Sequence, residues 1–228
     1  MSKRCIFSYA NFQIERDVLI SNQAVVEKFK AKDCTYEFLN YNAPDGQIVP
    51  DQVIDFALEV LFFERQYDTV LIIDVDCVPL NKHALEYTFA QAEARTLIGN
   101  VQRSNHIENN MHVYVAPSCM CLTRDMFSDL DFPSFAPTNR GDIGEEVSYI
   151  AERRKDMNME LFLPSKYEAL PYSEDKPWDL NLELPKYGIG TTFVNSKNEE
   201  MFYHLFQCRV GVFNHYFYDK CKTLLSCP

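Results

Sequence analysis

The sequence TVLIIDVD, at residues 69–76, carries the strongest indication of fold and chemistry in this chain. Its aliphatic run is typical of a buried β-strand, and the run ends in two carboxylates, Asp74 and Asp76. Two like charges at the end of a buried strand repel each other, and a bound divalent cation with oxygen ligands relieves that repulsion. The structural alternative is that both acids only cap the following turn. A second Asp-x-Asp tripeptide, at residues 129–131, has no such strand before it, and we expect it to be solvated.

Strand and helix patterns alternate on both sides of this stretch through the first hundred residues. We expect strands at 3–9, 35–41, 69–74 and 96–102, and helices at 17–30, from the N-cap Asp51 onward, and at 82–94. Such alternation predicts an α/β fold with a mixed, mostly parallel central sheet flanked by helices. Ligands bind at the carboxyl ends of the strands in sheets of this kind. The edge that carries Asp74 and Asp76 is therefore where we expect the chemistry.

The pattern is less regular after residue 100. We expect two short strands or one bent strand at 112–123, a helix at 142–154, and short strands at 160–164, 190–194 and 201–206. Polar, proline-containing loops are expected at 128–141 and 173–185. The sequence contains no repeat and no linker, which favours a single domain.

The composition excludes several kinds of partner. The chain has 33 acidic and 22 basic residues, a net charge of -11, and residues 41–100 alone contain ten acidic and three basic residues. Nucleic-acid binding and attachment to anionic lipid both depend on basic residues, so we expect neither. No apolar run approaches the roughly 20 residues of a membrane span, and the first residues lack the apolar segment of a signal peptide. We expect a cytoplasmic protein whose eight scattered cysteines are mostly buried, reduced thiols.

Four segments, in this order, resemble the metal-dependent glycosyltransferases of the GT-A fold. They are the strand that ends in Asp74 and Asp76, the small-residue segment 115–127, the Gly-Glu-Glu at 144–146, and the segment 202–206 with His204. The resemblance implies one domain, residues 1–228, in which 1–100 bind a nucleotide sugar while 101–228 bind the acceptor and complete the metal site. The short length and residues 201–209 also resemble the small glycosyltransferases that chloroviruses encode for capsid glycans, which would act in the host cytoplasm.

This resemblance implies a hexosyltransferase that moves a hexose from a UDP-sugar to a glycan or glycoprotein acceptor, with Mn²⁺ or Mg²⁺ as cofactor. The expected metal ligands are Asp74, Asp76 and His204, with His215 as the alternative to His204. The donor would contact residues at the strand ends and one basic residue near the diphosphate. These residues are Ser8, Tyr9, Ala10, Asn11, Asp74, Val75, Asp76 and Arg209, with Lys220 and Lys222 as weaker candidates.

A carboxylate is also expected to take the proton of the acceptor hydroxyl, and Glu146, Glu145 and Asp142 are the candidates. Asp142 and Glu145 form an Asp-x-x-Glu capping box, so both could serve only to start a helix. Glu146 lies outside the box and is the better candidate for the base. Histidines 83, 106 and 112 are expected on the surface or in loops.

Two other functions remain open from the sequence. The first is a haloacid-dehalogenase-like phosphatase, in which Asp74 would attack phosphorus and Asp76 would act as acid and base. In that family the motif usually follows the first strand, whereas two strand–helix units precede it here. The second is a nucleotide- or glycan-binding module that has the fold without turnover.

Overall fold

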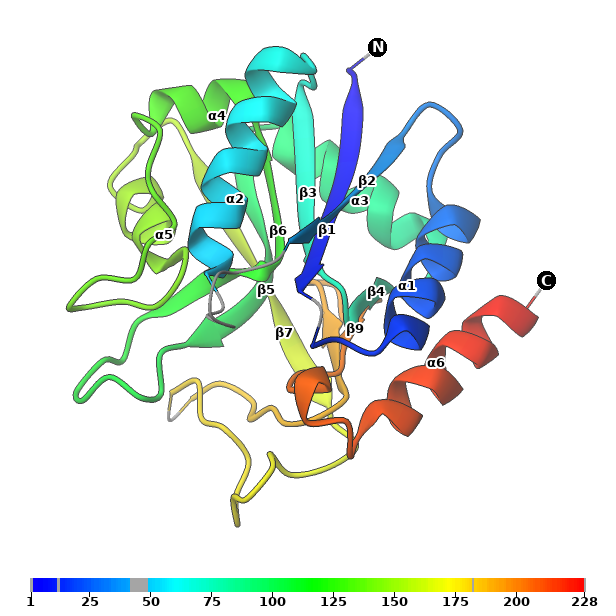
Figure 1. The fold of residues 1–228 in the computed structure, drawn as a ribbon. Helices are drawn as coiled ribbons and strands as arrows, with labels where there is room; N and C mark the ends of the chain where they lie inside the picture. The colour runs from blue at the N-terminus through cyan, green and yellow to red at the C-terminus, as the bar shows by residue number, and fades with distance from the viewer. Residues whose placement is uncertain (1, 12, 42–48, 182, 228) are drawn as a thin grey trace.

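The computed structural model of the protein describes residues 2–11, 13–41, 49–181 and 183–227. Within these residues, nine strands form one curled sheet in the order β2-β1-β3-β6-β5-β7-β8-β9-β4 (Figure 1). The strands are β1 (Arg4–Asn11), β2 (Thr35–Tyr41), β3 (Thr69–Asp74), β4 (Cys77–Pro79), β5 (Thr96–Arg103), β6 (Val113–Thr123), β7 (Asn158–Lys166), β8 (Thr191–Val194) and β9 (Glu200–His204).

The sheet is mixed, as the sequence predicts, and helices cover both of its faces. Among the described strands, β1 is parallel to β2 and β3, and β5 is parallel to β7, whereas the other neighbouring pairs are antiparallel. Because β6 is antiparallel to both β3 and β5, these two strands point the same way. The strands β1, β2, β3, β5, β7 and β9 therefore end at one common edge. This is the GT-A-like, Rossmann-type arrangement, although fewer neighbouring pairs are parallel than we expected because β6 is inserted between β3 and β5.

Alternating side chains of the inner strands pack against different helices. The helices are α1 (Arg16–Phe29), α2 (Pro50–Glu59), α3 (Lys82–Glu93), α4 (Arg124–Asp129), α5 (Glu145–Ala151) and α6 (Asn214–Ser226). Leu71 and Ile73 of β3 pack with α1, α3 and α6, while Val70 and Ile72 pack with α2, α4 and α5. Successive side chains of a strand point to opposite faces, so the apolar run of β3 is explained by burial on both faces.

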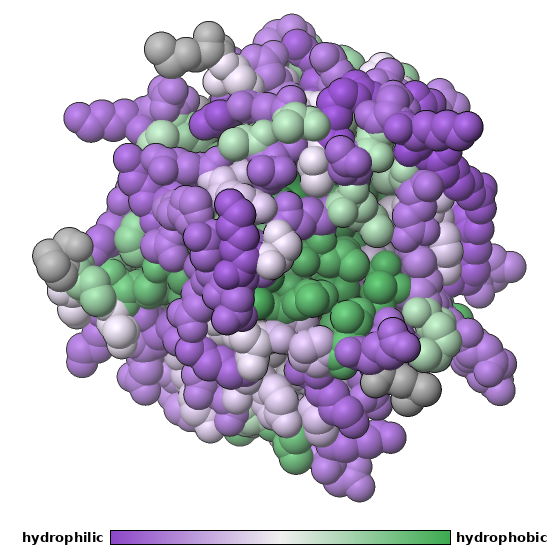
Figure 2. All heavy atoms as spheres, turned by 180° about the vertical axis from the view of Figure 1, so that it is seen from behind, coloured by the Kyte–Doolittle hydropathy of each residue, from purple (hydrophilic) through white to green (hydrophobic). Residues whose placement is uncertain are grey.

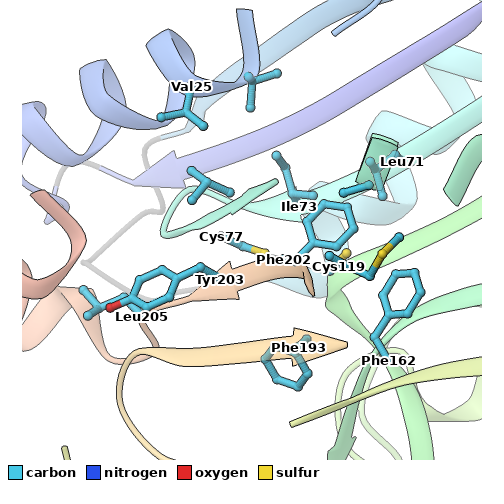
Figure 3. Packing of buried hydrophobic residues seen from close by; sticks show 14 of the residues in the cluster. Val25, Leu71, Ile73, Cys77, Cys119, Phe162, Phe193, Phe202, Tyr203 and Leu205 are labelled. Carbon is cyan, nitrogen blue, oxygen red and sulfur yellow. The ribbon is translucent and has the colours of Figure 1, made fainter. Parts of the chain in front are cut away.

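The sheet curls so that its last strands return to the middle strand. β4 lies at the end of the strand order, yet it follows β3 directly through Val75 and Asp76. Figure 3 shows the buried side chains in this curl, where Phe162 of β7 and Phe202 of β9 have ring centroids 5.8 Å apart. The curl brings the end of β9, in the last third of the chain, against the residues that follow β3.

Several predicted boundaries are wrong in their details. β1 continues through Asn11, two residues beyond the predicted end at residue 9. α2 begins at Pro50, and Asp51 lies in its first turn without capping it, since proline fits the first helical position. α5 is shorter than predicted, because Gly144 adopts a left-handed φ of 74° just before it. Residues 113–123 form one strand, and the tail forms α6.

The surface and the cysteines agree with a folded, polar-surfaced domain. Seen from behind, the molecule is mostly hydrophilic, with apolar side chains gathered across the middle of that face (Figure 2). All eight cysteines are free thiols, and Cys227 is the one that is exposed. Among the described residues, the helices are too short or too polar to cross a bilayer.

Candidate functional site

A cleft of about 820 Å³ lies at the edge where most of the strands end. The ends of β1 and β3, the segment after β9, and the loops after β5 and β7 form its walls. Its volume falls within the roughly 300–1,000 Å³ that is usual for sites binding small molecules. Both acidic and aromatic side chains line the cleft, including Asp74, Asp76, Asp142, Tyr9 and Trp178.

Three potential metal ligands meet in this cleft. One ligand atom from each of Asp74, Asp76 and His204 lies within 4.8 Å of the others. His204 Nε2 is 3.1 Å from Asp76 Oδ1 and 3.6 Å from Asp74 Oδ2. The backbone fixes this meeting, because Cys77 of β4 pairs with His204 of β9 and the Leu205 N–H donates to the Asp76 carbonyl at 2.9 Å.

The two carboxylates have opposite pKa shifts. Burial raises the pKa of Asp74 to about 6, and the charge of Asp76 acts in the same direction while His204 opposes it. Burial also acts to raise the pKa of Asp76. The charge and hydrogen bond of His204, together with hydrogen bonding from Cys208, outweigh burial and hold the pKa of Asp76 below its usual value. One imidazole therefore offsets the effect of burial for Asp76 but not for Asp74.

The donor set fits a divalent cation. Two carboxylate oxygens and one imidazole nitrogen converge, and carboxylates are the ligands that Mn²⁺ and Mg²⁺ prefer. The ring of His204 packs against that of Phe206, with centroids 3.7 Å apart and the ring planes tilted by 34°. Its second nitrogen, Nδ1, is buried and has no hydrogen-bond partner among the residues that the structure describes. Packing on Phe206 thus performs the orienting task that a hydrogen bond to the second nitrogen usually performs in metal sites.

Most of the residues predicted to contact the donor line this cleft. They are Tyr9, Ala10, Asn11, Asp74, Val75, Asp76 and Arg209. Ser8 is different, because it is fully buried and is not among the described residues that line the cleft.

The alternative ligand His215 lies elsewhere. It is on α6, where its Nδ1 is 3.1 Å from the carbonyl of Val212. The Asp74, Asp76 and His204 cluster does not include it. Lys220, on the same helix, lies with its Nζ 4.9 Å from the ring centroid of Tyr203. The structure thus brings His204 to the two acids and leaves His215 apart from them.

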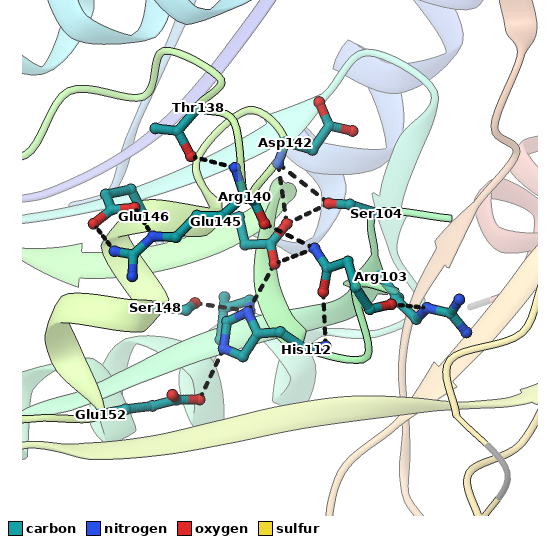
Figure 4. A network of polar contacts seen from close by, with 12 residues as sticks. Arg103, Ser104, His112, Thr138, Arg140, Asp142, Glu145, Glu146, Ser148 and Glu152 are labelled. Atoms are coloured by element: carbon teal, nitrogen blue, oxygen red, sulfur yellow. Dashed lines mark hydrogen bonds and ion pairs between the residues drawn. The ribbon is translucent and has the colours of Figure 1, made fainter. Parts of the chain in front are cut away.

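Glu145 belongs to a second polar network, shown in Figure 4. It is fully buried, and its Oε1 lies 3.0 Å from Asn110 Nδ2 and 2.8 Å from His112 Nδ1. Its Oε2 accepts from the Asp142 backbone N–H at 3.0 Å and from the Ser104 hydroxyl. Burial alone would raise the pKa of Glu145, but these hydrogen bonds lower the pKa to about 2. A carboxylate held this way is a very weak base.

His112 completes this network and was not expected there from the sequence. Its Nε2 lies 3.1 Å from Glu152 Oε1, and its ring stacks on Tyr149 with centroids 3.8 Å apart. Burial opposes protonation of this histidine, yet its hydrogen bonds to Glu145 and Glu152 raise its pKa overall. The role of His112 follows only from its neighbours in the folded structure, because nothing in the sequence distinguishes it from a surface histidine.

Asp142 and Glu146 lie on opposite sides of Glu145. The Glu146 carboxylate forms a two-point ion pair with Arg140, in which the Nε to Oε2 distance is 3.0 Å, and it is not among the described residues of the cleft. Asp142 lines the cleft, and Figure 4 shows its carboxylate pointing away from Glu145. The Asp142 backbone N–H donates to Glu145, and Asp142 Oδ1 accepts from the Ile143 N–H at 2.8 Å. Asp142 is therefore the one of the three candidate bases that lines the cleft.

Sequence reasoning missed several residues of the cleft. They include Arg103, Tyr114, Trp178, Tyr187 and Phe206. Arg103 lies at the end of β5, which makes it a strand-end residue like Asp74 and therefore recognisable in principle. Trp178 and Tyr187 come from the long segment between β7 and β8, whose path no periodicity predicts, while Tyr114 lies on β6 and Phe206 just after β9.

No protein-family model matches the sequence. No curated protein matches it either. In fold, the chain resembles a mannosyltransferase from Pyrobaculum calidifontis solved with GDP-Man and Mn²⁺, at a TM-score of 0.45 and 12% identity, over 69% of this chain and 53% of that one. The match therefore spans about half the length of the mannosyltransferase.

Two viral proteins are also similar. A197 from STIV matches at a TM-score of 0.41 and 16% identity, over 64% of this chain and 78% of that chain. A glycosyltransferase involved in the glycosylation of the major capsid of PBCV-1 matches at 0.35 and 13% identity, over 55% of this chain and 62% of that one. Each is a likeness of fold at low sequence identity.

Proposed function

We propose that this protein is a metal-dependent hexosyltransferase that moves a hexose from a UDP-sugar to a glycan or glycoprotein acceptor, in the capsid glycosylation of a virus and in the cytoplasm of its host. The observation that carries the transferase proposal is the convergence of Asp74, Asp76 and His204 in a cleft large enough for a nucleotide sugar. The choice of UDP and of a viral acceptor rests on the sequence resemblance described above.

Asp74, Asp76 and His204 would hold the cation, Mn²⁺ or Mg²⁺. Such an ion offsets the negative charge of a leaving diphosphate. Arg209 also lines the cleft, close to Cys208, whose backbone N–H lies 3.4 Å from Asp76 Oδ2. The guanidinium group of Arg209 would bind diphosphate oxygens on the side of the cleft formed by the segment after β9. Tyr9, Ala10 and Asn11 would contact the nucleoside at the end of β1.

Asp142 is our proposed general base. Glu145 is hydrogen-bonded to four neighbouring groups and has a pKa of about 2, and Glu146 is paired with Arg140 outside the cleft. Asp142 lines the cleft, and its Oδ2 lies 3.9 Å from His106 Nδ1. It can accept the proton of an acceptor hydroxyl as that oxygen attacks the anomeric carbon.

Binding of nucleotides separates this function from the alternatives. Thermal unfolding would be followed with UDP, GDP and CMP, each with and without Mn²⁺. We expect UDP to raise the unfolding temperature only when Mn²⁺ is present, because the diphosphate is then bound through the cation. Stabilisation by no nucleotide under any condition would refute the proposal. Hydrolysis of p-nitrophenyl phosphate in the same preparation would favour the phosphatase with Asp74 as nucleophile instead.

Turnover separates an enzyme from a binding module. The protein would be incubated with a panel of radiolabelled UDP-hexoses, Mn²⁺ and water or mixed glycosides as acceptors, and release of UDP would be measured. We expect UDP release with one or a few of the sugars. Tight binding of UDP without release from any of them would indicate a module that has the site but no activity.

A further inference from the structure

Trp178 is the only tryptophan in the sequence, and it lies in the wall of the cleft. It belongs to the long segment between β7 and β8, which is anchored at its base by pairing of Ala169 with Ile189. Trp178 itself exchanges two backbone hydrogen bonds with Tyr187, with N to O distances of 2.9 and 3.1 Å. Its position is therefore fixed although most of the segment has no regular structure.

Trp178 is part of a continuous aromatic wall. Its ring centroid lies 5.3 Å from that of Tyr187 and 5.6 Å from that of Phe206, and the latter two are 5.5 Å apart. Phe206 packs in turn against the ring of His204, the proposed metal ligand. The wall thus extends from the metal ligands to the outer part of the cleft. Phe206 and Tyr187 are nearly fully buried, whereas Trp178 is only partly buried.

A carboxylate borders the exposed part of this wall. The indole N–H of Trp178 donates to Glu174 Oε1 at 3.0 Å, and Glu174 also lines the cleft. A carboxylate has four acceptor positions on its two oxygens, so Glu174 can accept further hydrogen bonds. An apolar ring face beside a fixed acceptor matches a pyranose ring, which presents C–H groups on its face and hydroxyls at its edge.

The wall lies beside the proposed base. Asn105 Nδ2 is 3.4 Å from the Tyr187 hydroxyl, and the adjacent residue His106 is 3.9 Å from Asp142. The acceptor must bring its hydroxyl to the base, so its ring should lie on the wall next to Asp142. The ends of β1 and β2, with Tyr9 and Tyr41, line the cleft as well and offer the nucleoside separate surfaces.

We propose that Trp178 and Glu174 bind a pyranose ring of the acceptor, and therefore that the acceptor is a carbohydrate. The ring stacks on the indole, and Glu174 accepts a hydrogen bond from one of its hydroxyls. This inference rests on the proposed glycosyltransferase function for its choice of acceptor over other ligands.

The single tryptophan makes the test direct, because all tryptophan emission comes from this site. The full chain with UDP and Mn²⁺ would be titrated with the methyl glycosides of glucose, galactose and mannose up to about 100 mM, which covers weak binding. Sorbitol, with similar hydroxyls but no ring, is the control. We expect a saturable change in emission with at least one glycoside and none with sorbitol. An unchanged emission with all three glycosides, or an equal response to sorbitol, would overturn the proposal.

Variants test whether the indole of Trp178 is the group that binds the glycoside. Trp178→Ala should weaken binding of the glycoside at least tenfold by calorimetry, and Trp178→Phe should retain most of it, because the aromatic face is kept. Tyr172→Ala is the matched control, since Tyr172 is an exposed aromatic of the same segment outside the described lining of the cleft. All three variants should keep the Mn²⁺-dependent stabilisation by UDP.

The outcomes also distinguish failure of this inference from failure of the proposed function. Loss of UDP binding in Trp178→Ala, with glycoside binding unchanged, would make the indole a support for the nucleotide and overturn the inference alone. Saturable glycoside binding in a protein that binds none of the nucleotides would overturn the proposed function. Trp178 would then belong to a carbohydrate-binding site in a protein without nucleotide binding.

Discussion

Two groups of acids and histidine lie near each other in this molecule and behave in opposite ways. In the first, His204 faces both Asp74 and Asp76, and burial raises the pKa of Asp74 to about 6. In the second, Glu145 is surrounded by hydrogen-bond donors, and its pKa falls to about 2. The two groups differ in the number of hydrogen-bond donors that surround each carboxylate. A buried carboxylate with its donors supplied holds the structure together, while a pair that shares one imidazole is suited to bind a cation.

Asp142 connects the two groups and gives the largest expected effect. Asp142→Asn removes the proposed base while retaining its shape, so turnover should fall about 10²- to 10⁴-fold with UDP binding unchanged. UDP release from the donor found above is the measurement. Glu146→Gln is the matched control and should leave turnover within about twofold, because its partner Arg140 lies away from the cleft. The reverse result would make Glu146 the base.

The second network is tested by removal of its central carboxylate. Glu145→Ala should lower the free energy of unfolding by about 3–5 kcal/mol, since it leaves Asn110, Ser104 and His112 without their buried partner. Urea denaturation measures this. Glu146→Ala, which breaks a more exposed pair, should cost less than about 1 kcal/mol. Equal losses in the two variants would contradict the structural role of Glu145.

The first group should respond most strongly in binding. Asp76→Asn should weaken Mn²⁺-dependent UDP binding by at least about 100-fold, because it removes one of the proposed metal ligands. Calorimetry with UDP and Mn²⁺ is the measurement. Asp131→Asn, in the second Asp-x-Asp tripeptide, should have no effect on binding. A similar loss in both variants would remove Asp76 from the metal site.

The smallest effect is a dependence of stability on pH. The folded-state pKa of His112 is raised, so its contribution to stability is complete below its ordinary value near 6.5 and is lost as the pH rises through the folded value. The stability difference between the protein and His112→Gln should therefore be larger at pH about 6 than at about 9, by on the order of 1 kcal/mol. His83→Gln, at an exposed pair with Glu199, is the control. A pH-independent difference would show that His112 is not protonated in the folded protein.

The sequence alone determined the layout of the first half of the chain and its most important residues. The alternation of apolar runs and amphipathic helices predicted β1, β2, β3 and the helices between them, since those periods reflect burial along a local stretch of chain. The aliphatic run before Asp74 and Asp76 placed both acids at a strand end, because a strand buried on both faces has to continue to the edge of the sheet.

Only the tertiary structure decided which histidine meets those acids and which acid faces the cleft. Residues 76 and 204 are 128 positions apart, and their contact depends on the curl of the sheet that pairs β4 with β9. Glu145 looked like a capping residue or a base from the sequence; the structure keeps its contact with the Asp142 N–H and adds Ser104, Asn110 and His112 as buried partners. Burial and hydrogen-bond partners are properties of the folded surroundings, so a sequence names the ionisable residues but does not set their charge.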